Sequence, residues 1–324
     1  MKRVLVTGGA GYIGSHAVVQ LLDKGYEVVV LDNLENGYSE LVDKRAKFYL
    51  ADLRDKNSLR RVFEAEEIDA VMNFAAYIKV GESVEKPTMY YENNTYGVMN
   101  LIDIMVEYGV KNIVFSSTAA VYGEVKGDRL VDEEFPTDPI NPYGMSKLMS
   151  ERIITDAAKA YGMNYSIFRY FNVAGAHEDY NIGQKGEGIT ALVPIILQVA
   201  KGERRELGIF GDDYDTPDGT GVRDYIHVVD LVDAHILALD TLKERVSGIY
   251  NLGNGSGFSV LEMLEAAKRV TKRDIPSKVE PVRPGDPACV VAASERAYKI
   301  LGWEPRYTSV EDIIRTAWEW EQKL

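Results

Sequence analysis

A glycine-rich turn between a buried strand and a helix lies near the start of the chain and strongly limits its possible folds. Residues 4–7 form a continuous apolar run typical of a buried strand, and an apolar helical pattern continues after the turn through Leu22. Gly8, Gly11 and Gly14 recur every third residue, a variant of the dinucleotide-binding spacing. Glycines there permit a tight turn and a close approach of the backbone to a pyrophosphate, which the amino end of the helix also attracts.

A second apolar strand at residues 27–31 ends at Asp32. An acid at this distance from the glycine turn is expected to bind the adenosine ribose hydroxyls of a dinucleotide. Its charge would repel a 2′-phosphate, and no arginine follows it closely in the sequence, so the pattern favours NAD over NADP. The alternative is an ordinary glycine-rich loop with Asp32 capping a turn. The order strand, glycines, helix, strand and acid favours a nucleotide site.

Strand and helix patterns alternate through the first half of the chain, which predicts an α/β fold with a doubly wound parallel Rossmann sheet. We expect residues 1–175 to form this domain, with about 222–255 returning to it, and residues 176–324 to form mainly a smaller lobe. The other predicted strands are 47–50, 70–74, 112–117, 164–170 and 249–252, and the other predicted helices are 55–66, 88–108, 142–161, 228–242 and one from Val310.

Tyr143 and Lys147 are a candidate proton-relay pair on the helix predicted at 142–161. Asn141 can cap this helix, and Pro142 suits its first position. Residues four apart share one helix face, so the phenol and the ammonium should point the same way. The ammonium is expected to lower the pKa of Tyr143, and a bound oxidised nicotinamide would lower it further. Such a tyrosine can take a proton from a sugar or alcohol hydroxyl.

Composition excludes several classes of function. The formal net charge of −13 argues against nucleic acid or an anionic membrane as a partner, and no apolar run is long enough to span a bilayer. A single cysteine, Cys289, excludes an internal disulfide and fits a reducing cytoplasm. The four histidines lack metal-ligand spacing, so no metal is expected. His227 and His235 fall in a stretch predicted to be helical and are interpreted as structural.

Five blocks of the sequence, in the same order, resemble the UDP-glucose 4-epimerases of the extended short-chain dehydrogenase/reductase family. The resemblance runs over essentially the whole chain, and it is the conjunction of blocks that makes it specific. The blocks are TGGAGYIGSH at 7–16, FSSTAAVYG at 115–123, the Tyr143/Lys147 pair, YFN at 170–172 and GVRDYIH at 221–227.

This resemblance implies an NAD-dependent isomerase that interconverts UDP-glucose and UDP-galactose through a transient 4-keto sugar. Tyr143 would remove the proton of the sugar 4-hydroxyl while NAD takes the hydride, which then returns to the opposite face. Lys147 would hold the nicotinamide ribose and lower the Tyr143 pKa. Thr118 would hydrogen-bond the same hydroxyl; the alternative for Thr118 is a strand-end hydroxyl that bonds only to local backbone.

The resemblance also implies further ligand-binding residues. An arginine fork suits phosphate oxygens, although surface ion pairs are an alternative for Arg223 and Arg283. The implied cofactor residues, besides the three glycines, Tyr143 and Lys147, are Tyr12, Ile13, Asp32, Asn33, Asp52, Leu53, Phe74, Ala75, Ala76, Asn93, Ser116, Tyr170 and Phe171. The implied UDP-sugar residues, in what would be mainly the smaller lobe, are Asn172, Phe210, Arg223, Arg283, Asp286 and Cys289, together with Thr118 and Tyr143.

Two positions depart from the family pattern. Ala191 falls where well-known members carry an asparagine that contacts the substrate, so one hydrogen bond is expected to be missing or replaced. Cys289 occupies the position whose bulk gates the sugar pocket, where some members have tyrosine. A small side chain there leaves room for an N-acetyl group, so we expect activity on UDP-N-acetylglucosamine and UDP-N-acetylgalactosamine as well. The alternative is a small buried thiol without influence on specificity.

Other functions remain as alternatives. A nucleotide-sugar 4,6-dehydratase is disfavoured, because such relatives place Asp-Glu after the threonine and this chain has Ala119 and Ala120. Epimerases acting on UDP-xylose or UDP-glucuronate are harder to separate. A non-catalytic dinucleotide sensor is the alternative from another class, although such proteins commonly lose the tyrosine–lysine pair. Fold analogy also predicts a homodimer that pairs helices 88–108 and 142–161 of two subunits.

Overall fold

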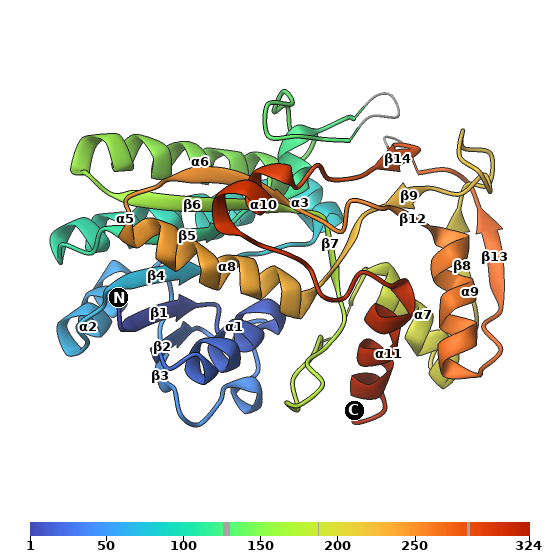
Figure 1. Ribbon diagram of the computed structural model, residues 1–324, viewed down its shortest axis with the longest axis horizontal. Helices are drawn as coiled ribbons and strands as arrows, with labels where there is room; N and C mark the ends of the chain where they lie inside the picture. Colours follow the sequence, from blue (N-terminus) through green and yellow to red (C-terminus); the bar gives the residue numbers. More distant parts are fainter. Residues whose placement is uncertain (126–129, 187, 284–285) are drawn as a thin grey trace.

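A seven-stranded sheet lies at the centre of the computed structural model, which describes residues 1–125, 130–186, 188–283 and 286–324 (Figure 1). Its strands lie in the order β3-β2-β1-β4-β5-β6-β11, and all neighbouring strands pair in parallel. This order is that of a doubly wound sheet, so the predicted fold class is confirmed. The strands are β1 (Arg3–Thr7), β2 (Glu27–Asp32), β3 (Lys47–Leu50), β4 (Ala70–Asn73), β5 (Asn112–Ser116), β6 (Asn164–Tyr170) and β11 (Gly248–Leu252).

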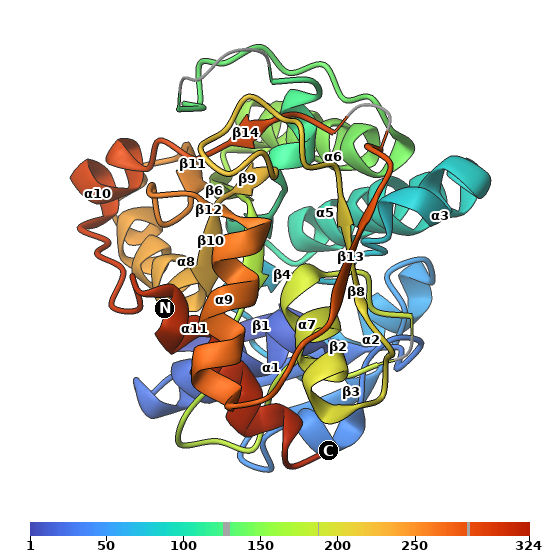
Figure 2. The same ribbon diagram turned by 90° about the vertical axis from the view of Figure 1, so that its right-hand side faces the viewer.

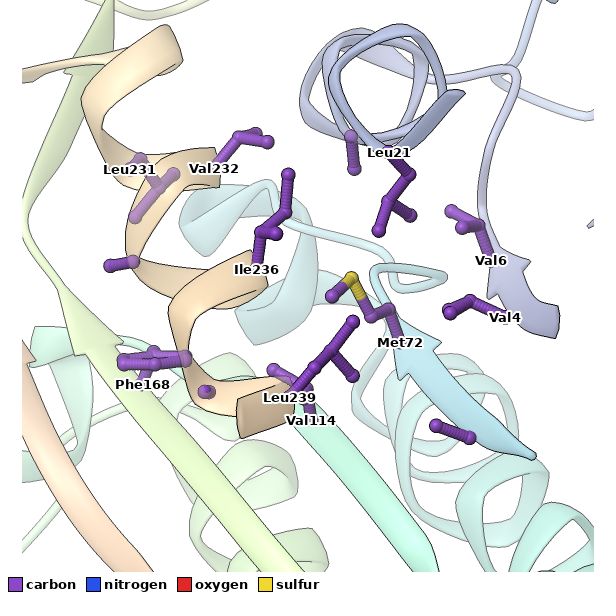
Figure 3. Packing of buried hydrophobic residues seen from close by; sticks show 14 of the residues in the cluster. Val4, Val6, Leu21, Met72, Val114, Phe168, Leu231, Val232, Ile236 and Leu239 are labelled. Atoms are coloured by element: carbon purple, nitrogen blue, oxygen red, sulfur yellow. The ribbon is translucent and has the colours of Figure 1, made fainter. Parts of the chain in front are cut away.

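One face of the sheet is covered by α1 (Tyr12–Asp23), α8 (Val228–Lys243) and α10 (Glu295–Leu301). Because successive residues of a strand point to opposite faces, a strand covered on both sides reads as a continuous apolar run, as residues 4–7 do. Figure 3 shows the packing of α1 and α8 on the strands. The labelled side chains include Leu21 of α1, Ile236 and Leu239 of α8, Val4 and Val6 of β1, and Met72 of β4.

The opposite face is covered by α2 (Lys56–Ala65), α5 (Gly97–Glu107) and α6 (Pro142–Tyr161). Leu5 of β1, which lies between the residues that face α1, points into this second core. As expected, Asn141 caps α6: its Oδ1 accepts from the backbone N–H of Gly144 at 2.8 Å.

The helix predicted over residues 88–108 is interrupted. A short α3 (Val80–Glu85) and α4 (Pro87–Tyr90) are followed by a π-helical segment, Tyr91–Tyr96, before α5 begins. A π-helical turn changes the direction of the side chains that follow it, and such turns are frequent at functional sites. Two 3₁₀ turns, Ser39–Leu41 and Ala119–Tyr122, lie in loops at the carboxyl edge of the sheet.

A second lobe with its own core lies beside the sheet and is built on α7 (Leu192–Lys201), α9 (Val260–Thr271) and α11 (Val310–Glu321) (Figure 2). Most of these elements had no clear pattern in the sequence. Short strands pair around the three helices: β8 (Leu207–Phe210) with β13 (Ser277–Glu280), β7 (Asn172–Ala174) with β10 (Tyr225–His227), and β9 (Val222–Arg223) with β12 (Phe258–Ser259) and β14 (Cys289–Val290).

His227 and His235 are both buried and have structural contacts. The prediction that His227 lies in a helical stretch is wrong, because His227 ends β10 and its Nδ1 caps α8 by accepting from the Val229 N–H at 3.1 Å. His235 does lie in α8, where its two ring nitrogens contact the Leu231 carbonyl and the Ser116 hydroxyl, each at 2.9 Å.

Candidate active site

The loop between β1 and α1 is too tightly packed to accept a side chain at Gly8 or Gly14. Gly8 has φ of +72°, a left-handed conformation that favours glycine, and a Cβ added there would lie 2.6 Å from the Ala75 nitrogen. A Cβ added to Gly14 would lie 2.0 Å from the Gly8 carbonyl oxygen. Gly11, at the N-cap of α1, gives the helix no side-chain cap. The bare loop and the uncapped helix end fit the pyrophosphate of NAD.

Asp32 lies at the carboxyl end of β2 beside this loop. Its Oδ2 accepts from the Ala10 N–H at 3.0 Å and its Oδ1 from the Leu34 N–H at 2.8 Å. Burial raises the pKa of Asp32, and the two backbone N–H groups oppose that rise. Asn33 donates to Asp52 Oδ2 at 2.9 Å, so the carboxyl ends of β2 and β3 bring these three predicted residues together.

The fold places Arg54 in this group, which the sequence did not indicate because Arg54 follows Asp32 by more than twenty residues. Its Nη2 lies 2.6 Å from Asp52 Oδ2 and 3.0 Å from Glu35 Oε2. The bond to Arg54 is the main reason that the pKa of Asp52 falls to about 2. Two carboxylates thus neutralise Arg54, so its charge is not free for a 2′-phosphate, which agrees with the preference for NAD.

Thr118 and Tyr143 meet at the carboxyl edge of β5. Tyr143 is 9% exposed and Thr118 is 8% exposed, and the Thr118 side chain lies close enough to the phenol to oppose the rise in the Tyr143 pKa. Thr118 Oγ1 also accepts from the Ala120 N–H at 3.2 Å, capping the 3₁₀ turn that follows β5. The local backbone contact and the contact with the phenol therefore coexist, and a substrate hydroxyl could be held between the two oxygens.

Lys147 lies one turn after Tyr143 on α6 and is buried. Its Nζ donates to the Ser116 carbonyl at 2.7 Å and lies 4.9 Å from the centroid of the Phe115 ring. Burial lowers the pKa of Lys147 to about 7, and the charge of Glu151 opposes that shift. The ammonium is therefore anchored to the end of β5, next to Thr118.

The expected lowering of the Tyr143 pKa by Lys147 is wrong for the protein by itself. The pKa of Tyr143 is raised, because burial disfavours the phenolate, and only the hydrogen bond with Thr118 opposes this. Lys147 directs its Nζ to the Ser116 carbonyl rather than to the phenol. Tyr143 therefore needs a further positive charge to ionise near neutral pH.

The other predicted cofactor residues line the ends of β4, β5 and β6. Ser116 Oγ lies 2.9 Å from His235 Nε2, and the rings of Phe74 and Tyr170 lie 5.0 and 6.3 Å from the His235 ring. One predicted residue faces a neighbouring side chain instead: Asn93, in the π-helical segment, donates to Asn94 Oδ1 at 3.1 Å. The remaining residues of this set, Tyr12, Ile13, Ala75, Ala76 and Phe171, are half-buried, whereas Leu53 is buried.

The predicted substrate residues of the second lobe form two contacts of their own. The guanidinium of Arg283 lies 3.5 Å from the centroid of the Phe210 ring, and Arg223 Nη2 lies 3.8 Å from Asp286 Oδ1. Asn172, at the start of β7, donates to the Asp224 carbonyl at 3.0 Å. The half-buried Arg223, the exposed Arg283 and the Phe210 ring could hold the phosphates and the base of a nucleotide.

Of the two positions that depart from the family pattern, Cys289 lies next to these contacts. Cys289 is half-buried and pairs with Val222 in the β14–β9 ladder, so it neighbours Arg223. Ala191 is the N-cap of α7 and makes no side-chain cap hydrogen bond. An asparagine at this position would supply such a cap.

No group of His, Cys, Asp and Glu side chains among the described residues is placed to hold a metal ion. Within the same residues, every helix is too short or too polar to cross a membrane.

Residues 4–253 match the model of the NAD dependent epimerase/dehydratase family. The chain belongs to this family. It is 52% identical to the UDP-glucose 4-epimerase of Lacticaseibacillus casei, over 98% of this chain and 96% of that protein.

Solved structures of family members superpose closely on the chain. A crystal structure of a UDP-glucose 4-epimerase has a TM-score of 0.97 at 53% identity, covering 99% of this chain and 98% of that one. The UDP-glucose 4-epimerase from Bifidobacterium longum, solved in complex with NAD+ and UDP, has a TM-score of 0.93 at 43% identity, over 99% and 98% of the two chains.

Proposed function

We propose that this chain is a UDP-glucose 4-epimerase that interconverts UDP-glucose and UDP-galactose with NAD as its cofactor. The observation that carries the proposal is the meeting of Thr118, Tyr143 and Lys147 at the carboxyl edge of a doubly wound sheet, beside a glycine loop that fits a dinucleotide. The match to the epimerase family over residues 4–253 supports the same function.

Bound NAD supplies a reversible two-electron oxidation of the sugar at C4. Tyr143 takes the proton of the 4-hydroxyl and later returns it. Thr118 hydrogen-bonds the same hydroxyl and orients it toward the phenol of Tyr143. Lys147 holds the nicotinamide ribose and keeps a positive charge at the end of β5. Since burial raises the pKa of Tyr143, the positive charge of the oxidised nicotinamide is what would make this tyrosine a base.

We assign the two ligands to different parts of the chain. Residues 1–175, with 222–255, hold NAD through the glycine loop and the strand-end residues. Residues 176–324 hold mainly the UDP-sugar, with Arg283 on the phosphates, Phe210 on the uracil and Asp286 on the ribose. Arg223, at the start of the segment 222–255, is the exception in that segment and joins Arg283 on the phosphates. The contacts of Arg283 with the Phe210 ring and of Arg223 with Asp286 bring these side chains together in pairs, which supports this division.

The function is tested by incubating the purified protein with UDP-galactose and no added reductant, and identifying the products by NMR. We expect UDP-glucose to form until the two sugars reach equilibrium. Parallel reactions with UDP-xylose and UDP-glucuronate separate the related epimerases. If UDP-galactose is unchanged while another sugar is converted, the substrate assignment is wrong; if none is converted, the dinucleotide-sensor alternative gains support.

Cys289 should permit activity on N-acetylated sugars. Its side chain is small, and β14 places it beside Arg223, which we assign to the phosphates. Cys289→Tyr adds a ring to this pocket, and overpacking of this kind costs about 1–3 kcal/mol. We expect kcat/KM for UDP-N-acetylglucosamine to fall about tenfold or more, whereas kcat/KM for UDP-glucose changes little. A wild-type protein that ignores the acetylated sugar would contradict this prediction.

We propose that the enzyme is a homodimer that pairs the α5–α6 face of two copies. Tyr96, Met99 and Met149 lie on the π-helical segment, α5 and α6, and are 48%, 45% and 42% exposed. Contiguous exposed apolar side chains commonly mark an interface. Met99→Glu/Met149→Glu should give a monomer in light scattering coupled to gel filtration, whereas Leu50→Glu, at an exposed position on β3, should not. A wild-type monomer would contradict the proposal.

We also place the enzyme in the cytoplasm and in galactose metabolism. A chain with a single cysteine can make no internal disulfide, which fits a reducing compartment. Fractionation of cells of the source organism, with epimerase activity followed in each fraction, tests the location.

A further inference from the structure

A buried ion pair lies directly behind the candidate active site and takes no part in the chemistry proposed above. Glu151 of α6 is 2% exposed and Arg169 of β6 is 5% exposed. Arg169 Nη2 donates to Glu151 Oε2 at 2.7 Å, and its Nε lies 3.1 Å from Glu151 Oε1. The hydroxyl of Ser117 also donates to Glu151. The carboxylate is therefore held by two partners on two other elements.

The bonds among Glu151, Ser117 and Arg169 connect α6 to the carboxyl ends of β5 and β6, which carry the candidate active site. Glu151 lies one turn after Lys147 on the helix that also carries Tyr143, Ser117 immediately precedes Thr118, and Arg169 immediately precedes Tyr170. The bonds to Glu151 therefore oppose a shift of α6 relative to the ends of β5 and β6, which would also move Tyr143 away from Thr118.

The Arg169 side chain continues this network away from the site. Its Nη1 donates to the Tyr122 hydroxyl at 3.2 Å, and that hydroxyl donates to Asn251 Oδ1 at 2.6 Å. Asn251 in turn donates to the Val131 carbonyl at 2.8 Å. All of these side chains are buried, so their hydrogen bonds tie β6 and β11 to the segment that follows the site.

A buried ion pair is a weak source of stability, because desolvation of the two charges offsets their attraction, and apolar residues of similar size often serve as well. Its presence at this place needs another reason. We propose that Glu151 and Arg169 are positioning residues, which hold Tyr143, Lys147 and Thr118 in the geometry that turnover requires. This inference rests on the proposed epimerase function.

The charges around Lys147 support a role for Glu151 beyond packing. Burial lowers the pKa of Lys147 to about 7, and Glu151 is the charge that opposes this shift. The elements around Lys147 also carry Tyr143 on α6, Arg169 and Tyr170 on β6, and His235 on α8, whose pKa burial lowers to about 4. None of these supplies a second negative charge near neutral pH.

The test is the double variant Glu151→Leu/Arg169→Met, which replaces the pair by apolar side chains and leaves no single buried charge. We expect the variant to fold and its kcat to fall about tenfold or more, with KM for UDP-galactose little changed, because misplacement of catalytic groups lowers turnover strongly. In protein freed of dinucleotide, the NMR titration of ¹³C-labelled Lys147 should move to lower pH. A folded double variant with wild-type kcat and an unchanged Lys147 titration overturns the proposal.

Two further variants keep the test decisive. Ser117→Ala removes the hydroxyl that bonds to Glu151 and leaves the ion pair intact. It tests the positioning role if the double variant does not fold. In that case a wild-type kcat in Ser117→Ala would overturn the proposal. Glu66→Gln is the matched control, since Glu66 is a buried carboxylate bonded to Lys47 at 2.9 Å, next to the amino ends of β1 and β3. It should lose stability but keep kcat and the Lys147 titration.

Failure of this inference is distinguishable from failure of the proposed function. Wild-type turnover of UDP-galactose is measured first and decides the function. The Lys147 titration needs neither substrate nor turnover, so it tests the effect of Glu151 even if the sugar assignment is wrong.

Discussion

Replacing Tyr143 by phenylalanine should lower kcat by about 10²–10⁴-fold, the usual contribution of a general acid or base, and leave NAD bound. The change removes only the phenolic oxygen. The ring packs with Tyr77 and Tyr90 in a small buried cluster, and phenylalanine preserves those contacts. Steady-state kinetics measure the loss of turnover, and chromatography of the nucleotide released on denaturation measures the retained NAD.

Tyr250→Phe is the matched control for this variant. Tyr250 is 1% exposed and belongs to the core between the sheet and α8, away from the carboxyl edge. Its variant should keep kcat. Full turnover by Tyr143→Phe would show that Tyr143 is not the catalytic base. Loss of NAD from the variant would mean that the phenol serves cofactor binding rather than proton transfer.

Replacing Gly14 by alanine should weaken the binding of NAD. The added Cβ would lie 2.0 Å from the Gly8 carbonyl oxygen and 2.8 Å from the Gly9 Cα, and all of these atoms belong to the backbone of the turn. The turn must open to admit the methyl group, at a cost of about 1–3 kcal/mol for overpacking of this kind. We expect a lower melting temperature and an affinity for NAD reduced about tenfold or more in calorimetry.

Gly81→Ala provides the comparison, because Gly81 lies in helix α3 and an added Cβ meets nothing within 4 Å. Alanine is the better helix former by about 1 kcal/mol, so this variant should be as stable as the wild type or more so, with NAD bound. Equal affinities for NAD in the two variants would show that close packing at Gly14 is not what shapes the cofactor loop.

The parts of the fold that could be predicted from the sequence are those governed by local patterns. The run at residues 4–7, the glycine spacing and the position of Asp32 depend on residues close together in the chain, and the order of strands and helices leaves few topologies. The second lobe was harder to predict. Its strands β9, β12 and β14 are two residues each, and their pairing depends on contacts between distant segments.

In the candidate active site, too, the local patterns could be predicted from the sequence and the contacts between distant segments could not. A spacing of four on a helix is enough to place Tyr143 and Lys147 on one face, but it does not show that Lys147 bonds to Ser116. The direction of the Tyr143 pKa depends on burial, which is a property of the assembled core. Glu151 and Arg169 had no local motif, because their partners come from other segments of the chain. Arg54 bonds to Asp52 two residues before it, but its contact with Glu35 depends on the fold.

The ion pairs of Arg54 with Asp52 and Glu35 bear on how the choice between NAD and NADP could change in this fold. A phosphorylated dinucleotide needs a cation at the adenosine end, and this chain already carries one there, balanced by acids. A change of specificity from NAD to NADP would thus begin with the loss of acidic side chains, Glu35 and Asp32 first. It would not require the gain of a new basic side chain. Selectivity here resides in the anions that surround the guanidinium.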